Sequence, residues 1–260
     1  CRKTNQTKLV LGLSGGIDSA LSAAIAVEAV GAQNVIGVAL PSRFSSNHSI
    51  TDAEKLAANL SIELRKIPID AVHKAFESAL QFSDLAGENL QARIRAVLLM
   101  GISNTDDALL LSTGNKSEIA VGYSTMYGDS AGGFAPIKDL FKTDVWKVSS
   151  WLNSRGNDEV IPENSITKEP SAELRPDQID TDSLPDYETL DQILALLIEQ
   201  SATIEQVVAS GHPRQLAEKI ESMVRASEWK RSQGAIGTKT TTIAFGSGRR
   251  VPITTRFTTL

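Results

Sequence analysis

The residues that point most directly to chemistry lie in the segment Gly12-Leu13-Ser14-Gly15-Gly16-Ile17-Asp18-Ser19. An apolar run precedes this segment and a helical pattern follows it, so we expect a sharp turn between a strand and a helix. The paired glycines permit positive φ and a close approach of backbone to ligand. The first N–H groups of the helix, with the hydroxyls of Ser14 and Ser19, can surround an anion. The segment therefore predicts a phosphate-binding loop.

Two carboxylates suggest a metal beside this loop. Asp18 would repel phosphate on its own, so its position is explained when Mg²⁺ lies between the two. Glu118 follows the apolar run 108–111, and we expect it at the same edge of the sheet, where it can complete the oxygen shell of the metal. The alternatives remain open: Glu118 as an exposed carboxylate in the first turn of a helix, and Asp18 with Ser19 as capping residues of a plain glycine turn.

The elements that must position these residues alternate along the first half of the chain. Strand patterns cover residues 8–13, 34–40, 62–67 and 108–111, and helical patterns cover 19–30, 50–60 and 88–103. This alternation predicts an α/β fold with an open, doubly wound, mostly parallel sheet. In such sheets ligands bind beyond the carboxyl ends of the strands, here after Leu13, Leu40 and Leu111.

The second half of the chain is less regular. Residues 123–139 and 161–185 are predicted to be long loops, which we interpret as lids over the site. Helical spacing returns over residues 187–231, with a break at Gly211-His212-Pro213. We expect one domain over residues 1–260, in which residues 187–260 form a small helical C-terminal region and a tail that no pattern assigns.

Composition limits the class of protein. The net charge is −5, so nucleic acid is not an expected partner. Cys1 is the only cysteine, which excludes a disulfide framework or a sulfur-bound metal cluster within these residues. No apolar stretch is long enough for a membrane helix, and no signal peptide is recognisable. We expect a cytoplasmic protein without a membrane partner, and a longer native polypeptide because residue 1 is not methionine. The three histidines are scattered, so we predict no catalytic histidine and place each at the surface or at a helix end.

The phosphate loop is neither a Walker A loop nor a dinucleotide fingerprint. It resembles the SGGxDS loop of the N-type ATP pyrophosphatases, which cleave ATP between its α- and β-phosphates and adenylate a substrate. The resemblance implies a sheet of the adenine nucleotide alpha hydrolase-like type.

Four further strings resemble the synthetase part of the glutamine-dependent NAD synthetases, and the resemblance runs from about Lys8 to Phe257. They are Glu88-Asn89-Leu90-Gln91-Ala92-Arg93-Ile94-Arg95, Leu111-Ser112-Thr113-Gly114-Asn115-Lys116-Ser117-Glu118, Gly122-Tyr123-Ser124-Thr125-Met126-Tyr127-Gly128-Asp129 and Pro170-Ser171-Ala172-Glu173-Leu174-Arg175-Pro176. The resemblance implies amidation of deamido-NAD (nicotinic acid adenine dinucleotide) to NAD by ATP and ammonia, through an acyl-adenylate. In that family an amidase domain of nitrilase-like fold precedes the synthetase part and supplies ammonia from glutamine.

The resemblance also implies roles for individual residues. Asp18 and Lys142 are the implied catalytic residues, and Asp18 with Glu118 is implied to hold Mg²⁺. The implied ATP-binding residues are Gly12, Leu13, Ser14, Gly15, Gly16, Ile17, Asp18, Ser19, Thr113, Lys142 and Ser171. The implied substrate-binding residues are Asn89, Arg93, Glu118, Tyr123, Ser124, Thr125, Met126 and Lys230. Two contacts of the ammonia-dependent relatives are not carried over: those enzymes have a lysine where Met126 stands and an aspartate near Gly133, whereas this chain follows the glutamine-dependent pattern.

A homodimer is also implied. The helix predicted at 88–103 is apolar around much of its circumference and must be covered on a second side, by a partner subunit or by the C-terminal helices of the same chain. Two other functions remain open: another ATP pyrophosphatase ligase, similar to GMP synthetase or tRNA-modifying, and a non-catalytic sensor of adenine nucleotides.

Overall fold

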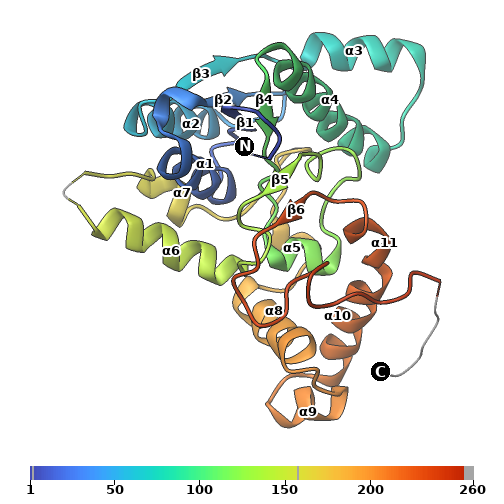
Figure 1. Cartoon of the computed structure of the whole chain (residues 1–260). Coiled ribbons are helices and arrows are strands. Elements are labelled where there is room, and N and C mark those ends of the chain that lie inside the picture. The colour runs from blue at the N-terminus through green and yellow to red at the C-terminus, as the bar shows by residue number, and fades with distance from the viewer. Residues whose placement is uncertain (2, 157, 255–260) are drawn as a thin grey trace.

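The main sheet has the predicted parallel, doubly wound arrangement (Figure 1). The computed structural model describes residues 1, 3–156 and 158–254. The strands are β1 (Lys8–Gly12), β2 (Val35–Ala39), β3 (Glu63–Lys66) and β4 (Ala108–Leu110), in the spatial order β3-β2-β1-β4. Neighbouring strands pair in parallel, with Leu9 opposite Val35 on one side and Leu109 on the other.

Helices cover both faces of this sheet. The helices α1 (Ile17–Val30) and α2 (Asn47–Asn59) lie on one face, and α4 (Asp84–Thr105) lies on the other. Alternate residues of β1 point to opposite faces of the sheet and belong to two hydrophobic cores. Leu9 and Leu11 pack with α1, and Val10 packs with Ile94 of α4. Because both faces are buried, β1 and β2 are continuous apolar runs rather than alternating ones.

The strand order reverses between β1 and β4. The chain moves outward from β1 through β2 to β3, then returns to place β4 against the other edge of β1. At such a reversal the loops that leave two neighbouring strands diverge and open a crevice. The phosphate loop and the segment after β4 therefore lie on the two sides of one crevice.

The C-terminal helices form a second core beside the sheet. The helices α5 (Lys116–Val121) and α6 (Lys142–Ser154) join α8 (Tyr187–Leu194), the π-helical turn Ala195–Glu199, α9 (Ile204–Ala209), α10 (Arg214–Ala226) and α11 (Glu228–Arg231). Lys116 joins this core to the tail: its fully buried ammonium contacts Asp139 at 2.9 Å and Glu199 at 2.6 Å, and donates to the Ile243 carbonyl at 2.9 Å. A buried cation requires such partners.

Several short elements were not predicted. They are the 3₁₀ turns Ala32–Asn34 and Asp180–Asp182, α3 (Asp70–Ala79), α7 (Glu163–Thr167), and the pair β5 (Phe134–Ala135) and β6 (Ile236–Gly237). The predicted loops 123–139 and 161–185 therefore contain regular elements that are too short to show a period. One of them, β5, forms by pairing with the distant β6. The last residues of the predicted tail, 255–260, lie outside the described residues. Among the described helices, none has the length and apolar character needed to cross a membrane.

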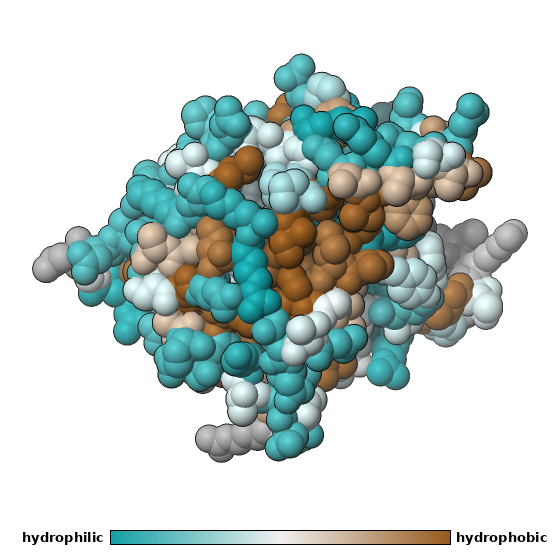
Figure 2. Space-filling model, turned by 90° about the horizontal axis from the view of Figure 1, so that it is seen from above, coloured by the Kyte–Doolittle hydropathy of each residue, from teal (hydrophilic) through white to brown (hydrophobic). Residues whose placement is uncertain are grey.

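The surface above the sheet is partly apolar. Exposed apolar side chains occur on α3, on the segment that follows it and on α4: Val72, Phe76, Leu80, Leu85, Val97 and Met100. In the view from above, an apolar area crosses the middle of the molecule and polar side chains border it (Figure 2). The C-terminal helices pack around α5 and α6, and they leave Val97 of α4 71% exposed. The proposed cover for α4 from within the same chain is therefore absent at this residue.

Candidate functional site

A cavity of about 310 Å³ opens at the carboxyl ends of β1, β2 and β4. Most of the predicted ATP-binding residues line it: Gly12, Leu13, Ser14, Gly16, Ile17, Asp18, Ser19, Thr113, Lys142 and Ser171. Glu118 and Tyr123 line it as well. The fold thus brings together predicted residues as far apart in the sequence as Gly12 and Ser171, at the edge where ligands bind parallel sheets.

The phosphate loop is held by its own serines. Ser19 donates from Oγ to the Gly16 carbonyl at 2.9 Å, and the Oγ atoms of Ser14 and Ser19 lie 3.2 Å apart. Gly15 has φ +79°, and a Cβ at this position would lie 2.2 Å from the Ser49 carbonyl oxygen. Only glycine fits there, because the backbone is left-handed and α2 begins directly behind it.

Lys142 lies between the two predicted metal ligands. Its Nζ donates to Oδ2 of Asp18 and lies 3.4 Å from Oε1 of Glu118. The lysine side chain is 3% exposed, whereas both carboxylates are 18% exposed and reach the cavity. Lys142 begins α6, so the start of this helix presents a cation to the phosphate loop.

The electrostatics of this group are those of a crowded anionic site. Burial, and then the neighbouring Asp18 carboxylate, raise the pKa of Glu118 to about 8. Burial opposes the charge of Lys142, but Asp18 and Glu118 outweigh it and raise the pKa of Lys142 above its ordinary value. A metal ion held by the two carboxylates would therefore have to displace the proton that the raised pKa keeps on Glu118.

One asparagine connects the two carboxylates. Asn115 is fully buried, caps α5 by accepting the Glu118 N–H at 3.0 Å, and donates from Nδ2 to Oδ1 of Asp18 at 2.8 Å. These two partners fix the orientation of the Asn115 amide, because only its oxygen can accept from an N–H and only its nitrogen can donate to a carboxylate. Asn115 was not among the residues predicted from the sequence.

The donor set fits Mg²⁺ bound together with phosphate. Within the described residues, no group of three or more His, Cys, Asp or Glu side chains is arranged to hold a metal by itself. Mg²⁺ in nucleotide sites is held by one or two carboxylates, and phosphate oxygens and waters complete its shell. Asp18 and Glu118 supply the carboxylates, and the adjacent loop would supply the phosphates.

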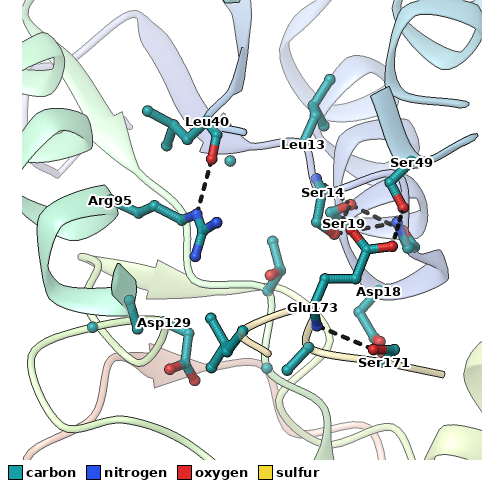
Figure 3. Close-up of a pocket in the computed structure, with 18 of the residues that line it drawn as sticks. Leu13, Ser14, Asp18, Ser19, Leu40, Ser49, Arg95, Asp129, Ser171 and Glu173 are labelled. Carbon is teal, nitrogen blue, oxygen red and sulfur yellow. Dashed lines mark hydrogen bonds between the residues drawn. The ribbon is translucent and has the colours of Figure 1, made fainter. Parts of the chain in front are cut away.

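The predicted lid 161–185 closes one side of the cavity (Figure 3). The Glu173 carboxylate accepts from Oγ of Ser49 at 2.6 Å and from Oγ of Ser46, the N-cap of α2, at 2.9 Å. Ser171, which lines the cavity, donates to the Gln178 carbonyl within the lid at 2.5 Å. The lid is therefore anchored next to the phosphate loop by a carboxylate at the start of a helix, where the helix dipole favours negative charge.

Asp180, in the same lid segment, interacts electrostatically with Lys142. Its Oδ2 accepts from the Tyr187 hydroxyl at 2.8 Å, whereas its buried Oδ1 has no hydrogen-bond partner among the described residues. Burial raises the pKa of Asp180. A buried oxygen without a partner at the wall of a cavity is available to a ligand or water.

The predicted substrate-binding residues gather around the segment 122–129. Thr125 donates to Oδ1 of Asn89 at 2.7 Å, and Arg93 donates from Nε to the Met126 carbonyl at 3.1 Å. Lys230 donates from Nζ to the carbonyls of Gly122 and Ser124, both at 2.8 Å. These contacts hold the segment in place.

Of the predicted substrate-binding residues, only Glu118 and Tyr123 line the large cavity. Ser124 and Lys230 line a second cavity of about 40 Å³, and Glu118 lines both. Asn89, Arg93, Thr125 and Met126 line neither cavity. Arg93 is exposed, and its contact with the Met126 carbonyl places it beside the segment 122–129.

Among the charged lining residues that were missed from the sequence are Arg95, Asp129 and Glu173. Each lies in a string that was recognised as a whole, but nothing in a string says which side chain faces inward. Asp129 lines both cavities, and burial raises its pKa. The surface or helix-end position expected for His73 was wrong in one respect: this residue of α3 is buried, with its Nδ1 2.9 Å from Nη2 of Arg43. It lines neither cavity.

Comparison with known proteins yields one family. The family described as NAD synthase matches residues 1–234. The glutamine-dependent NAD(+) synthetase of Thermotoga maritima is 51% identical over 98% of this chain and 46% of its own length. The chain thus spans less than half of that relative.

Solved structures also match most of the chain. The glutamine-dependent NAD+ synthetase of Acinetobacter baumannii, in complex with ADP, is 41% identical with a TM-score of 0.63, over 97% of this chain and 46% of that one. The NMN synthetase of Francisella tularensis is 29% identical with a TM-score of 0.77, over 89% of both chains.

Proposed function

The chain belongs to the NAD synthase family, and we propose that it catalyses the ATP-dependent amidation of deamido-NAD to NAD with ammonia as the nitrogen donor. The observation that carries the proposal is the meeting of Asp18, Glu118 and Lys142 beside the phosphate loop. A non-catalytic nucleotide sensor does not need two carboxylates and a buried lysine at the phosphates.

The proposed reaction has two steps in one site. The nicotinate carboxylate of deamido-NAD attacks the α-phosphorus of ATP, and the bond to the bridging oxygen breaks to release pyrophosphate. Ammonia then attacks the carbonyl carbon of the acyl-adenylate, AMP leaves, and one proton is lost to give the amide. The protein contributes positioning and charge neutralisation rather than a covalent nucleophile.

Each group of the site has a task in this proposal. The backbone N–H groups of the phosphate loop and the hydroxyls of Ser14 and Ser19 bind the phosphates. Lys142 donates to a phosphate oxygen as negative charge moves onto the leaving pyrophosphate. Asp18 and Glu118 would hold Mg²⁺, which when bound supplies charge neutralisation at the same oxygens. The lid anchored by Glu173 keeps water from the adenylate.

The second step also requires a binding site for ammonia and a group that accepts a proton from ammonium. The cavity of about 40 Å³ is large enough for a molecule the size of water or ammonia, and it shares Glu118 and Asp129 with the large cavity. Because burial raises the pKa of Asp129, this carboxylate suits the role of proton acceptor from an incoming ammonium ion.

Two further features belong to the proposal. Since the chain spans less than half of its glutamine-dependent relatives, an amidase domain or subunit upstream would supply ammonia. The exposed apolar side chains of α4 support a homodimer, in which Arg93 and its neighbours would meet deamido-NAD near the subunit boundary. The single-domain division of residues 1–260, with residues 187–260 as a helical region and tail, remains part of this proposal.

The test is product analysis with the purified chain. With ATP, Mg²⁺, deamido-NAD and ammonium chloride, we expect NAD, AMP and pyrophosphate in equal amounts by mass spectrometry. Glutamine in place of ammonium should give no NAD, because Cys1 is the only cysteine in the chain and no partner motif surrounds it. Asp18→Asn should lower the rate by about a thousandfold or more while the fold is retained.

The likeness to an NMN synthetase defines the control substrate. Nicotinic acid mononucleotide is assayed in parallel, and preference for it over deamido-NAD would replace the proposed substrate. Formation of ADP instead of AMP, or near-native turnover by Asp18→Asn, would contradict the proposed mechanism.

A further inference from the structure

Arg95 is a cation that points into the large cavity without a charged partner. It lies on α4, and its Nε donates to the Leu40 carbonyl at 2.9 Å, just beyond β2. Among the described residues, no carboxylate lies within ion-pair distance of its guanidinium, and the attraction of Glu173, Asp129 and Asp70 acts over a longer range. Burial lowers the pKa of Arg95 to about 10. An unpaired, partly desolvated cation is costly for the free protein, which suggests that a ligand completes its contacts.

The position of the guanidinium identifies the part of the cavity concerned. In the close-up, Arg95 extends from α4 toward the space below Leu40, and the phosphate loop with Ser14 and Ser19 lies on the opposite side (Figure 3). Apolar side chains from three strand ends and from α4 line the cavity: Leu13, Val38, Leu40, Ala96, Leu99 and Leu110. Of these, Leu40 lies beside Arg95. This end of the cavity suits a flat apolar group, whereas the opposite end suits phosphates.

The charges nearby argue against a second phosphate at this end. Asp129 lies on the same side of the cavity as Arg95, and a phosphate placed between the two side chains would meet this carboxylate. A neutral aromatic ring meets no such repulsion, and a guanidinium plane stacks favourably on an aromatic face.

We infer that Arg95 binds the purine base of ATP, by stacking its guanidinium on the ring in the apolar end of the cavity. The Leu40 carbonyl fixes the guanidinium through Nε, so its plane is oriented before the nucleotide arrives. This inference rests on the proposed function in that it takes ATP as the nucleotide. It adds the residue that distinguishes a nucleotide from a bare polyphosphate.

The experiment compares two ligands that share phosphates and differ in the base. Calorimetric titration of the 260-residue chain measures the affinity for ATP and for inorganic tripolyphosphate, each with Mg²⁺. For Arg95→Met we expect a loss of about tenfold or more in ATP affinity and no change for tripolyphosphate. Arg95→Lys keeps the charge without the plane, so we expect it to recover little of the loss.

Two arginines provide controls. Arg214→Met removes an exposed guanidinium on α10 and should leave both affinities unchanged. Arg155→Met removes an exposed arginine just beyond α6 that lines neither cavity, and should likewise leave both affinities unchanged. Arg95→Gln is the second variant if Arg95→Met does not fold, because its amide can still donate to the Leu40 carbonyl.

Three results would overturn the inference. They are unchanged ATP affinity in folded Arg95 variants, an equal loss for ATP and tripolyphosphate, and a wild-type chain that binds both ligands equally. Failure of the proposed function is a separate outcome, since NAD formation from deamido-NAD does not depend on which residue holds the base.

Discussion

Asn115 donates a hydrogen bond from Nδ2 to Oδ1 of Asp18 at 2.8 Å, from a position 97 residues later in the chain. Its Oδ1 accepts the N–H of Glu118 at 3.0 Å and caps α5. One buried side chain therefore orients the first carboxylate of the proposed metal site and fixes the helix that carries the second. Groups that hold a metal ligand in place matter for metal affinity without touching the metal.

Asn115→Ala should lower both Mg²⁺-dependent turnover and divalent-ion affinity, by about 10- to 100-fold. Asn115→Ser is the matched variant, because serine keeps a cap for α5 but cannot reach Asp18. The cap alone contributes about 1 kcal/mol of stability, measured as a shift in thermal unfolding. If the serine variant matches wild type in turnover and in Mn²⁺ affinity, the contact with Asp18 has no functional role.

Lys142→Met should have opposite effects on metal and on nucleotide. In the free site Lys142 contacts the same two carboxylates that would hold Mg²⁺, so a metal must compete with it. We expect Mn²⁺ affinity without nucleotide to rise by about tenfold or more, because the carboxylates lose their only close cation among the described residues. Affinity for ATP should fall, since the lysine is then missing from the phosphates. Both are measured by calorimetry or, for Mn²⁺, by electron paramagnetic resonance.

The control for this variant is Lys147→Met, which removes an exposed lysine of the same helix. It should change neither affinity. Weaker Mn²⁺ binding by Lys142→Met would show that the lysine organises the carboxylates rather than competing with the metal.

Stability of the metal-free protein should fall as the pH rises toward 8. Burial and the Asp18 carboxylate raise the pKa of Glu118 from the ordinary 4.5 to about 8. Between these values the folded state holds a proton that the unfolded chain has released, so the free energy of unfolding decreases with pH across this window. Denaturant titrations at several pH values in EDTA measure the slope. Glu118→Gln should flatten it, and an unchanged slope in that variant would assign the effect to another group.

Self-association should depend on the exposed apolar side chains of α4. Val97 and Met100 are 71% and 42% exposed, whereas Leu90 and Ile94 on the same helix are buried against the sheet. Val97→Asp should convert a dimer into a monomer at micromolar concentration, as measured by sedimentation velocity, because a charge would be buried at the interface. A wild-type chain that is monomeric and fully active would exclude the dimer as a functional requirement.

The sequence by itself determined the local features of the site. The phosphate loop between β1 and α1, the helix α4 and the parallel direction of the early strands were all predicted, because each depends on residues close together in the chain. Glycine at a left-handed turn, a helix start with free N–H groups, and buried apolar runs are local signals. The short elements α3, α7 and β5 were not predicted. Each packs on or pairs with another element: α3 with α4, α7 with α1, α2 and α6, and β5 with β6.

The tertiary structure decided which side chains meet. Arg93 and Arg95 are the same residue type in one recognised string, yet two positions on a helix differ by roughly 200° in direction. The packing of α4 on the sheet places Arg95 in the cavity and Arg93 outside it. Likewise, the contacts of Asp18 with Asn115 and Lys142 exist because the strand order puts β4 beside β1 and packs α6 against α1. Such meetings depend on register and helix rotation over the whole fold, which no short stretch of sequence encodes.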